Sequence, residues 1–135
     1  MTRSNETTNE TTGIIIFAHG SRVEEANAGV RELAGQVEQT SGLDYVRAAF
    51  LEFAQPDLAT AVAEAVGAGR RRLIVVPYFL TMGVHLQRDL PGLIAQERDR
   101  HPSLEIRVGD SLERHPRLPS LILDRIHAVM HDHES

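Results

Sequence analysis

Short apolar runs alternate along the chain with longer stretches of helical periodicity. The run "IIIFA" at residues 14–18 is continuous, rich in β-branched residues and followed by a glycine, as expected of a strand buried on both faces. Similar runs predict three further strands, at 44–52, 73–76 and 104–109. Between these runs, and after Pro116, apolar residues recur three or four positions apart, which predicts helices at 23–39, 56–69, 85–100 and from about 117 onward.

Several residues mark where these helices begin and end. Ser21 is the predicted N-cap of the first helix, and Glu24 follows it by three positions, as in a capping box. Gly42 is the predicted stop of that helix. Pro56 is the predicted first residue of the second helix, because proline is tolerated in a first helical turn.

Alternating strands and helices predict right-handed βαβ units. The expected fold is therefore one α/β domain with a four-stranded parallel sheet and helices on both faces. We expect the domain to span residues 13–131, between a disordered polar tail at 1–12 and a short C-terminal tail at 132–135. In such a sheet, the ligand crevice lies outside the carboxyl ends of the strands.

Composition narrows the possible functions. A chain of 135 residues fits one domain, and the absence of cysteine excludes thiolate metal ligands and cysteine nucleophiles. A net charge of −5 and 4% aromatic residues argue against a nucleic-acid partner. We see neither a secretion signal nor an apolar segment long enough to cross a membrane, so we expect a cytoplasmic protein without a membrane partner.

Three polar residues are predicted to meet at the carboxyl edge of the sheet. His19 follows the first strand, Glu52 ends the second, and His85 follows the third. Imidazole with a carboxylate suits a borderline divalent metal such as zinc, cobalt, iron or nickel. Each residue also has a plain structural explanation: a turn-capping histidine, a solvated strand end and a polar residue in a first helical turn.

The segment before His85 is apolar although it is predicted to be a loop. Aromatic and aliphatic residues beside polar ligands suggest a site for a flat, largely apolar molecule. Alternatively, Phe79 and Leu80 close the end of the core. Arg22 and Arg88 are candidates for pairing with ligand carboxylates, although surface charge is the commoner role of such arginines.

Four motifs resemble one known family, the small ATP-independent sirohydrochlorin metal chelatases. They are "HGSR" at 19–22, "AFLEFAQPDL" at 49–58, "VVPYFLTMGVHLQRDLP" at 75–91 and, more weakly, "DSLERHPRL" at 110–118. The resemblance implies a chelatase-type fold, a homodimer, metal-ligating His19 and His85, and a catalytic acidic residue at Glu52. The implied reaction inserts a divalent ion into sirohydrochlorin and releases two protons, with Co²⁺ expected and Fe²⁺ or Ni²⁺ as alternatives.

In this interpretation the metal is a substrate, and no tightly bound cofactor is expected. His19, Glu52 and His85 are the predicted catalytic residues. The predicted substrate-binding residues lie in the first and third motifs: Ser21, Arg22, Tyr78, Phe79, Leu80, Thr81, Met82, Gly83 and Arg88.

Two other functions fit the same residues. A metal or tetrapyrrole carrier without turnover would use the same ligands. A histidine-phosphatase-like enzyme would also place a histidine after its first strand, but it needs an arginine immediately before that histidine, where this chain has Ala18. Finally, His127, His131 and His133 near the end of the chain suggest either metal delivery or a solvated, fraying helix end.

Overall fold

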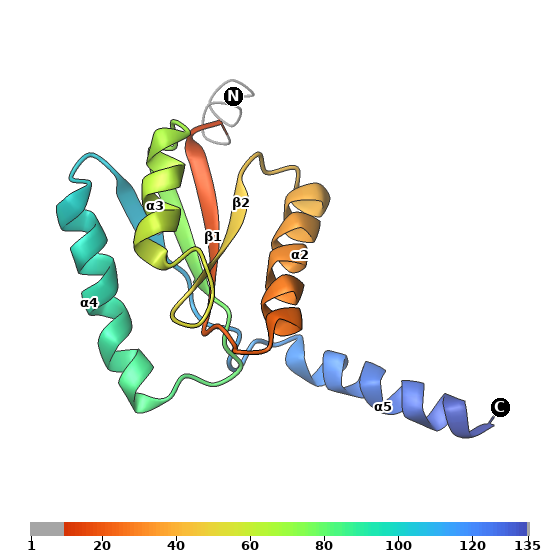
Figure 1. Ribbon diagram of the computed structural model, residues 1–135. Helices are drawn as coiled ribbons and strands as arrows, with labels where there is room; N and C mark the ends of the chain where they lie inside the picture. The colour runs from red at the N-terminus through yellow and green to blue at the C-terminus, as the bar shows by residue number, and fades with distance from the viewer. Residues whose placement is uncertain (1–9, 135) are drawn as a thin grey trace.

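The computed structural model describes residues 10–134 (Figure 1). Most of the expected N-terminal tail, and the last residue of the expected C-terminal tail, lie outside this range. The division of the chain into tails and a domain stays a prediction. The strands are β1 (Thr12–Ala18), β2 (Val46–Phe50), β3 (Arg72–Pro77) and β4 (Glu105–Val108), and the helices are α2 (Glu24–Ser41), α3 (Leu58–Gly67), α4 (Val84–Arg100) and α5 (Leu118–Glu134).

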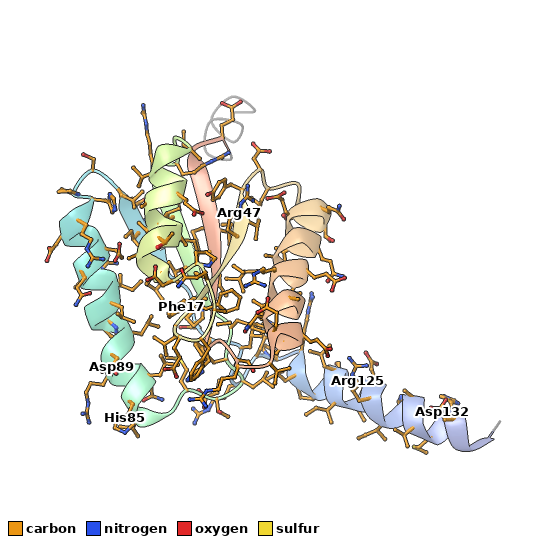
Figure 2. All side chains as sticks on the ribbon, viewed as in Figure 1. Phe17, Arg47, His85, Asp89, Arg125 and Asp132 are labelled. Atoms are coloured by element: carbon orange, nitrogen blue, oxygen red, sulfur yellow. The ribbon has the colours of Figure 1, made fainter. Side chains whose placement is uncertain are left out.

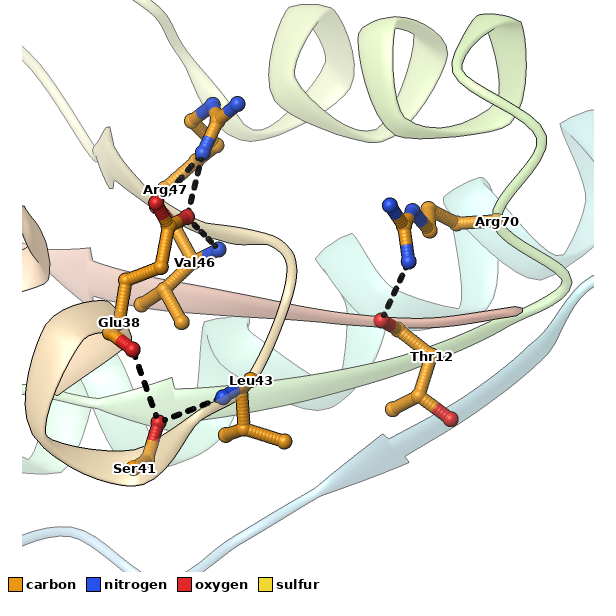
Figure 3. Close-up of polar contacts among 7 residues, drawn as sticks. All are labelled: Thr12, Glu38, Ser41, Leu43, Val46, Arg47 and Arg70. Carbon is orange, nitrogen blue, oxygen red and sulfur yellow. Dashed lines mark hydrogen bonds and ion pairs between the residues drawn. The ribbon is translucent and has the colours of Figure 1, made fainter. Parts of the chain in front are cut away.

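The four strands form one parallel sheet in the order β2-β1-β3-β4, which confirms the predicted fold class. β1 and β3 are central, and Ile14 pairs with Val46 on one side and with Ile74 on the other. The start of β1 is tied to the turn before β3, because Arg70 donates a hydrogen bond to the Thr12 carbonyl (Figure 3).

The side chains of β1 alternate between two cores. Ile15 and Phe17 pack with α3 and α4 on one face of the sheet. Ile14 and Ile16 pack toward α2 on the other. A strand covered on both faces must be apolar at every position, which is why this segment reads as an unbroken hydrophobic run.

The predicted helix ends are partly wrong. α2 begins at Glu24 with Val23 at the N-cap, while the Ser21 hydroxyl accepts a hydrogen bond from the Val23 amide and so closes a turn before the helix. α3 begins at Leu58, not at Pro56, because the Asp57 side chain caps it. Gly42 does end α2, in the left-handed conformation with φ of 75°.

α5 differs from the other helices because it extends away from the body of the molecule (Figure 1). It makes no sustained packing contact with any other described helix or strand. Six of its large apolar side chains are each between 46% and 64% exposed: Leu121, Ile122, Leu123, Ile126, Val129 and Met130. Even so, none of the helices in the described part of the chain combines the length and apolarity needed to cross a membrane.

Candidate functional site

His19 and Glu52 lie side by side at the carboxyl edge of the sheet. Beyond β1 and β2 the two chains continue in parallel, since Leu51 donates its amide hydrogen to the Ala18 carbonyl and Glu52 donates to that of His19. The side chains meet with 3.3 Å between His19 Nε2 and Glu52 Oε1. Both are about half exposed, at 55% and 50%, so the pair is open to a ligand from solution.

Gly20 allows this close approach. Its φ is +90°, and a Cβ built at this position would lie 1.8 Å from the backbone carbonyl oxygen of Glu52. Any other residue here would force the two loops apart. The glycine of the "HGSR" motif therefore sets the separation of the His19–Glu52 pair.

Asn27 holds the other side of this turn, and sequence analysis missed it. It is only 2% exposed. Its side-chain oxygen accepts from the Ser21 amide at 2.8 Å, and its side-chain nitrogen donates to the Ser21 carbonyl, also at 2.8 Å. In the sequence, the only indication of this role is that Asn27 lies on the face of α2 that points toward the sheet. A single asparagine at such a position is not enough to predict a buried hydrogen-bonding role.

The hydrogen bonds of His19 fix what its ring can offer to a ligand. Nδ1 donates to the Gly20 carbonyl at 3.1 Å, so in the neutral ring Nε2 carries a lone pair. That lone pair faces the Glu52 carboxylate, and two acceptors at this distance need a positive species between them, which is either a proton on Nε2 or a metal ion. If a divalent ion lay about 2.1 Å from both His19 Nε2 and Glu52 Oε1, the N–metal–O angle would be roughly 100°, close to the tetrahedral value.

The structure does not gather His85 into this pair. His85 is exposed in the first turn of α4, at the lower end of that helix in Figure 2. Within residues 10–134, no group of three or more His, Asp or Glu side chains is placed to hold one metal ion. The predicted second histidine ligand therefore stays a prediction.

The predicted substrate loop divides into buried and exposed residues. Phe79 packs edge-on against Phe17 with ring centroids 6.3 Å apart, and Met82 is partly buried against the same core. Tyr78 and Leu80 are exposed, at 38% and 64%. Phe79 therefore closes the end of the core, as the structural alternative predicted, while Tyr78 and Leu80 remain available to a ligand.

The polar members of the predicted site lie around the same edge. The Arg22 guanidinium lies 4.9 Å from the centre of the Phe53 ring and so connects the loops that follow β1 and β2. Thr81, Gly83 and Arg88 are exposed at the start of α4. Among residues 10–134, apart from its two chain neighbours, no atom lies within 4 Å of a Cβ built on Gly83, so there is open space beside this position.

Two hollows adjoin these residues. One, of about 420 Å³, is lined by His19, Ser21, Asn27 and Tyr78 among others. A larger groove of about 1150 Å³ lies between Tyr78, Leu80 and the apolar face of α5. Tyr78 belongs to both, so a flat ligand lying on Tyr78 would also reach His19.

The histidines of α5 lie apart from this site. The His127 and His131 rings are neighbours on the helix, with centroids 6.5 Å apart. The side chain of His133 lies outside the described part of the chain. The structure does not decide between metal delivery and a solvated helix end.

Comparison with known proteins assigns this chain to one family. The CbiX family model matches residues 13–129. The sirohydrochlorin cobaltochelatase of Methanopyrus kandleri is 29% identical over 133 aligned residues, which cover 84% of this chain and 93% of that protein. The chloroplastic sirohydrochlorin ferrochelatase of Arabidopsis thaliana is 32% identical over 120 residues, covering 88% of this chain but only 53% of the plant protein.

A solved structure with a similar fold also comes from this group. The crystal structure of a CbiX protein from Marinobacter aquaeolei VT8 superposes on this chain with a TM-score of 0.79 at 30% sequence identity. That protein is a candidate protein of cobalamin (vitamin B12) biosynthesis. The match covers 90% of this chain and 98% of the other. The shared fold therefore extends over nearly the whole described chain.

Proposed function

This chain belongs to the CbiX family, and from that premise we propose that it is a sirohydrochlorin metal chelatase. It inserts a divalent ion into the free-base macrocycle without ATP. The observation that carries the proposal is the His19–Glu52 pair, whose 3.3 Å separation at the open carboxyl edge of the sheet suits one divalent ion.

The reaction requires a metal ligand set and a proton acceptor. A divalent ion replaces two pyrrole N–H protons, so each turnover forms the metallated macrocycle and releases two protons. His19 Nε2 binds the incoming ion through its lone pair. Glu52 first shares the ion and then accepts one pyrrole proton as the ion passes to the ring, while the second proton passes to water at this open edge.

His85 is the proposed second histidine ligand. Because His85 is not grouped with His19 in this structure, the 80–83 segment has to rearrange when metal or tetrapyrrole binds. The exposure of Leu80 and the open space around Gly83 are compatible with such a movement. The macrocycle then lies against Tyr78 and Leu80, and Ser21, Arg22 and Arg88 face its polar groups.

We assign the apolar face of α5 to a second copy of this chain. That face is exposed and unpartnered in the described residues, and such a large apolar surface normally marks an interface. The plant relative is about twice as long as the matched region, so it has room for a second unit in one polypeptide. A homodimer would supply that unit here. The cytoplasmic location expected from the sequence stays a prediction.

Multiple-turnover kinetics test this function. The purified protein, mixed with an excess of sirohydrochlorin and Co²⁺, Fe²⁺ or Ni²⁺ under anaerobic conditions, should convert many equivalents of tetrapyrrole, as followed by absorbance. His19→Ala and Glu52→Gln should lower kcat by at least about 100-fold, as expected for loss of a ligand or proton acceptor. The fastest ion identifies the preferred metal.

His101→Ala is a control, because His101 is also a histidine at the end of a helix or strand but lies directly after α4, at the opposite edge of the sheet. It should leave the rate unchanged. A carrier would instead bind about one equivalent of metal or tetrapyrrole and stop. Normal turnover by both His19→Ala and His85→Ala would disprove the ligand set.

A further inference from the structure

The loop between β4 and α5 lines a hollow that the proposed site does not yet include. This hollow measures about 710 Å³ and lies between residues 109–116 and the start of α4. Met82 and Gln87 form its other wall, and the Gln87 side chain donates to the Met82 carbonyl. The hollow therefore adjoins the predicted substrate loop at the carboxyl edge of the sheet.

His115 faces this hollow in a defined tautomer. Its Nδ1 accepts a hydrogen bond from the Arg117 backbone amide at 3.0 Å. A neutral imidazole has one proton, so that proton must be on Nε2. His115 consequently offers a donor to a ligand, and it cannot bind a metal through Nε2 while this hydrogen bond holds.

Arg114 beside it is held in an unusual backbone conformation. Its φ is +63°, in the left-handed region that costs about 1–2 kcal/mol for a residue with a Cβ. Its exposed guanidinium has no ion-pair partner within residues 10–134. By contrast, five other arginines are paired with carboxylates: Arg31, Arg47, Arg72, Arg100 and Arg107.

Arg114 and His115 line the same hollow, and a guanidinium together with an N–H donor is suited to a carboxylate. All 14 basic residues of this chain are arginines, whose planar side chains bind carboxylates through two parallel hydrogen bonds. Asp110 and Glu113 line the same hollow and would repel a second carboxylate placed next to them. The hollow thus has one favourable position for an acid group, next to Arg114 and His115.

We propose that Arg114 and His115 form a subsite for one carboxylate side chain of the tetrapyrrole. The subsite orients the macrocycle over His19 and Glu52 from the β4 side. It rests on the proposed function only for the identity of the ligand, because the donor geometry is a property of this loop. Strain at Arg114 is consistent with a residue retained for binding and not for folding.

Two variants separate binding from folding. Arg114→Gly removes the guanidinium and relieves the left-handed backbone strain. His115→Asn keeps an acceptor for the Arg117 amide, but its shorter side chain places its N–H donor closer to the backbone than Nε2. In each, KM for sirohydrochlorin should rise roughly tenfold or more, as for loss of a charge-assisted hydrogen bond, while kcat and KM for the metal change little and the thermal midpoint does not fall.

Glu113→Gln should act in the opposite direction and lower KM for sirohydrochlorin, and His101→Ala again serves as the neutral control. Binding of metal-free sirohydrochlorin, measured by absorbance titration, gives a readout independent of turnover. Unchanged affinity in both Arg114→Gly and His115→Asn would overturn the subsite. If the wild type binds the pigment but never metallates it, and both variants still weaken binding, the subsite stands and the proposed function fails.

Discussion

At the scale of single residues, Gly20 determines whether His19 can lie beside Glu52. We predict that Gly20→Ala destabilises the fold by at least about 2 kcal/mol, because alanine is strained at φ of +90° and its Cβ would overlap the Glu52 carbonyl. The free energy of unfolding from urea titrations measures this loss. Metal insertion by the folded fraction should also fall, since the His19–Glu52 separation must grow.

Gly35→Ala is the matched comparison. Gly35 lies inside α2, and in the described part of the chain a Cβ built there meets nothing within 4 Å beyond its chain neighbours and the nearby helix backbone. Alanine at an open helical position should stabilise the protein by about 0.5–1 kcal/mol. If the two variants had equal effects on stability, the close approach at Gly20 would not be a constraint on the fold.

Sequence reasoning found the residues that follow strand ends but not those that support them. His19 and Glu52 were predicted to meet because neighbouring parallel strands end at one edge, and the structure pairs them. Asn27 was missed because its role depends on the fold of the Ser21 turn, which no pattern reveals. His85 cannot be placed from sequence, because its position depends on the conformation of the irregular segment after Pro77.

At the scale of elements, the start of α3 depends on the ionised Asp57 carboxylate. Hydrogen bonds from the Thr60 side chain and from its backbone amide hold the pKa of Asp57 below its ordinary value of 3.8. A lowered pKa means that the charged form stabilises the folded state. This contribution is fully present above the ordinary pKa and is lost as pH falls through the lower pKa of the folded state.

Two substitutions test this cap. Asp57→Ala should cost about 1 kcal/mol of stability at neutral pH, as for the loss of an N-cap. Asp57→Asn keeps a side-chain acceptor but cannot titrate, so its stability should fall less steeply than that of the wild type as pH drops below about 4. The measurement is the free energy of unfolding across the acid range. Parallel curves for the wild type and Asp57→Asn would contradict a role for the charge.

The regular elements were well predicted where burial is complete. β1 and β3 are central, so their apolar runs carry a strong signal, and their predicted and observed bounds differ by at most two residues. Helix starts were predicted less well, since the Ser21 hydroxyl closes a turn with Val23 instead of capping α2. A capping motif in sequence is compatible with both arrangements.

At the scale of the whole molecule, the sequence pattern predicts α5 but not where it lies relative to the sheet. Its periodicity predicts one apolar face but not what covers that face. In the structure, this face lines the 1150 Å³ groove beside Tyr78 and Leu80, next to the proposed tetrapyrrole site. A second copy seated there would enclose the macrocycle from the side opposite the sheet and exclude water from it.

This arrangement predicts a dimer that depends on the apolar face of α5. The wild type should have twice the 15.0 kDa mass of one chain in light scattering, and its thermal midpoint should rise with protein concentration. Ile122→Asp combined with Ile126→Asp should give a monomer, because it places two charges in the interface. Ser120→Asp adds a charge to the polar face of the same helix and should leave the dimer intact.

The concentration dependence distinguishes a second copy from a helix that folds back on its own chain. If α5 packed against its own sheet in solution, the Ile122→Asp and Ile126→Asp pair would lower the thermal midpoint equally at every protein concentration. If a second copy covers the helix, the thermal midpoint of the variant at any concentration should equal that of the wild type diluted until it is monomeric. If the wild type stays monomeric at high concentration, the proposed dimer is wrong. The chemistry of the His19–Glu52 pair would then have to proceed at an open edge of the sheet.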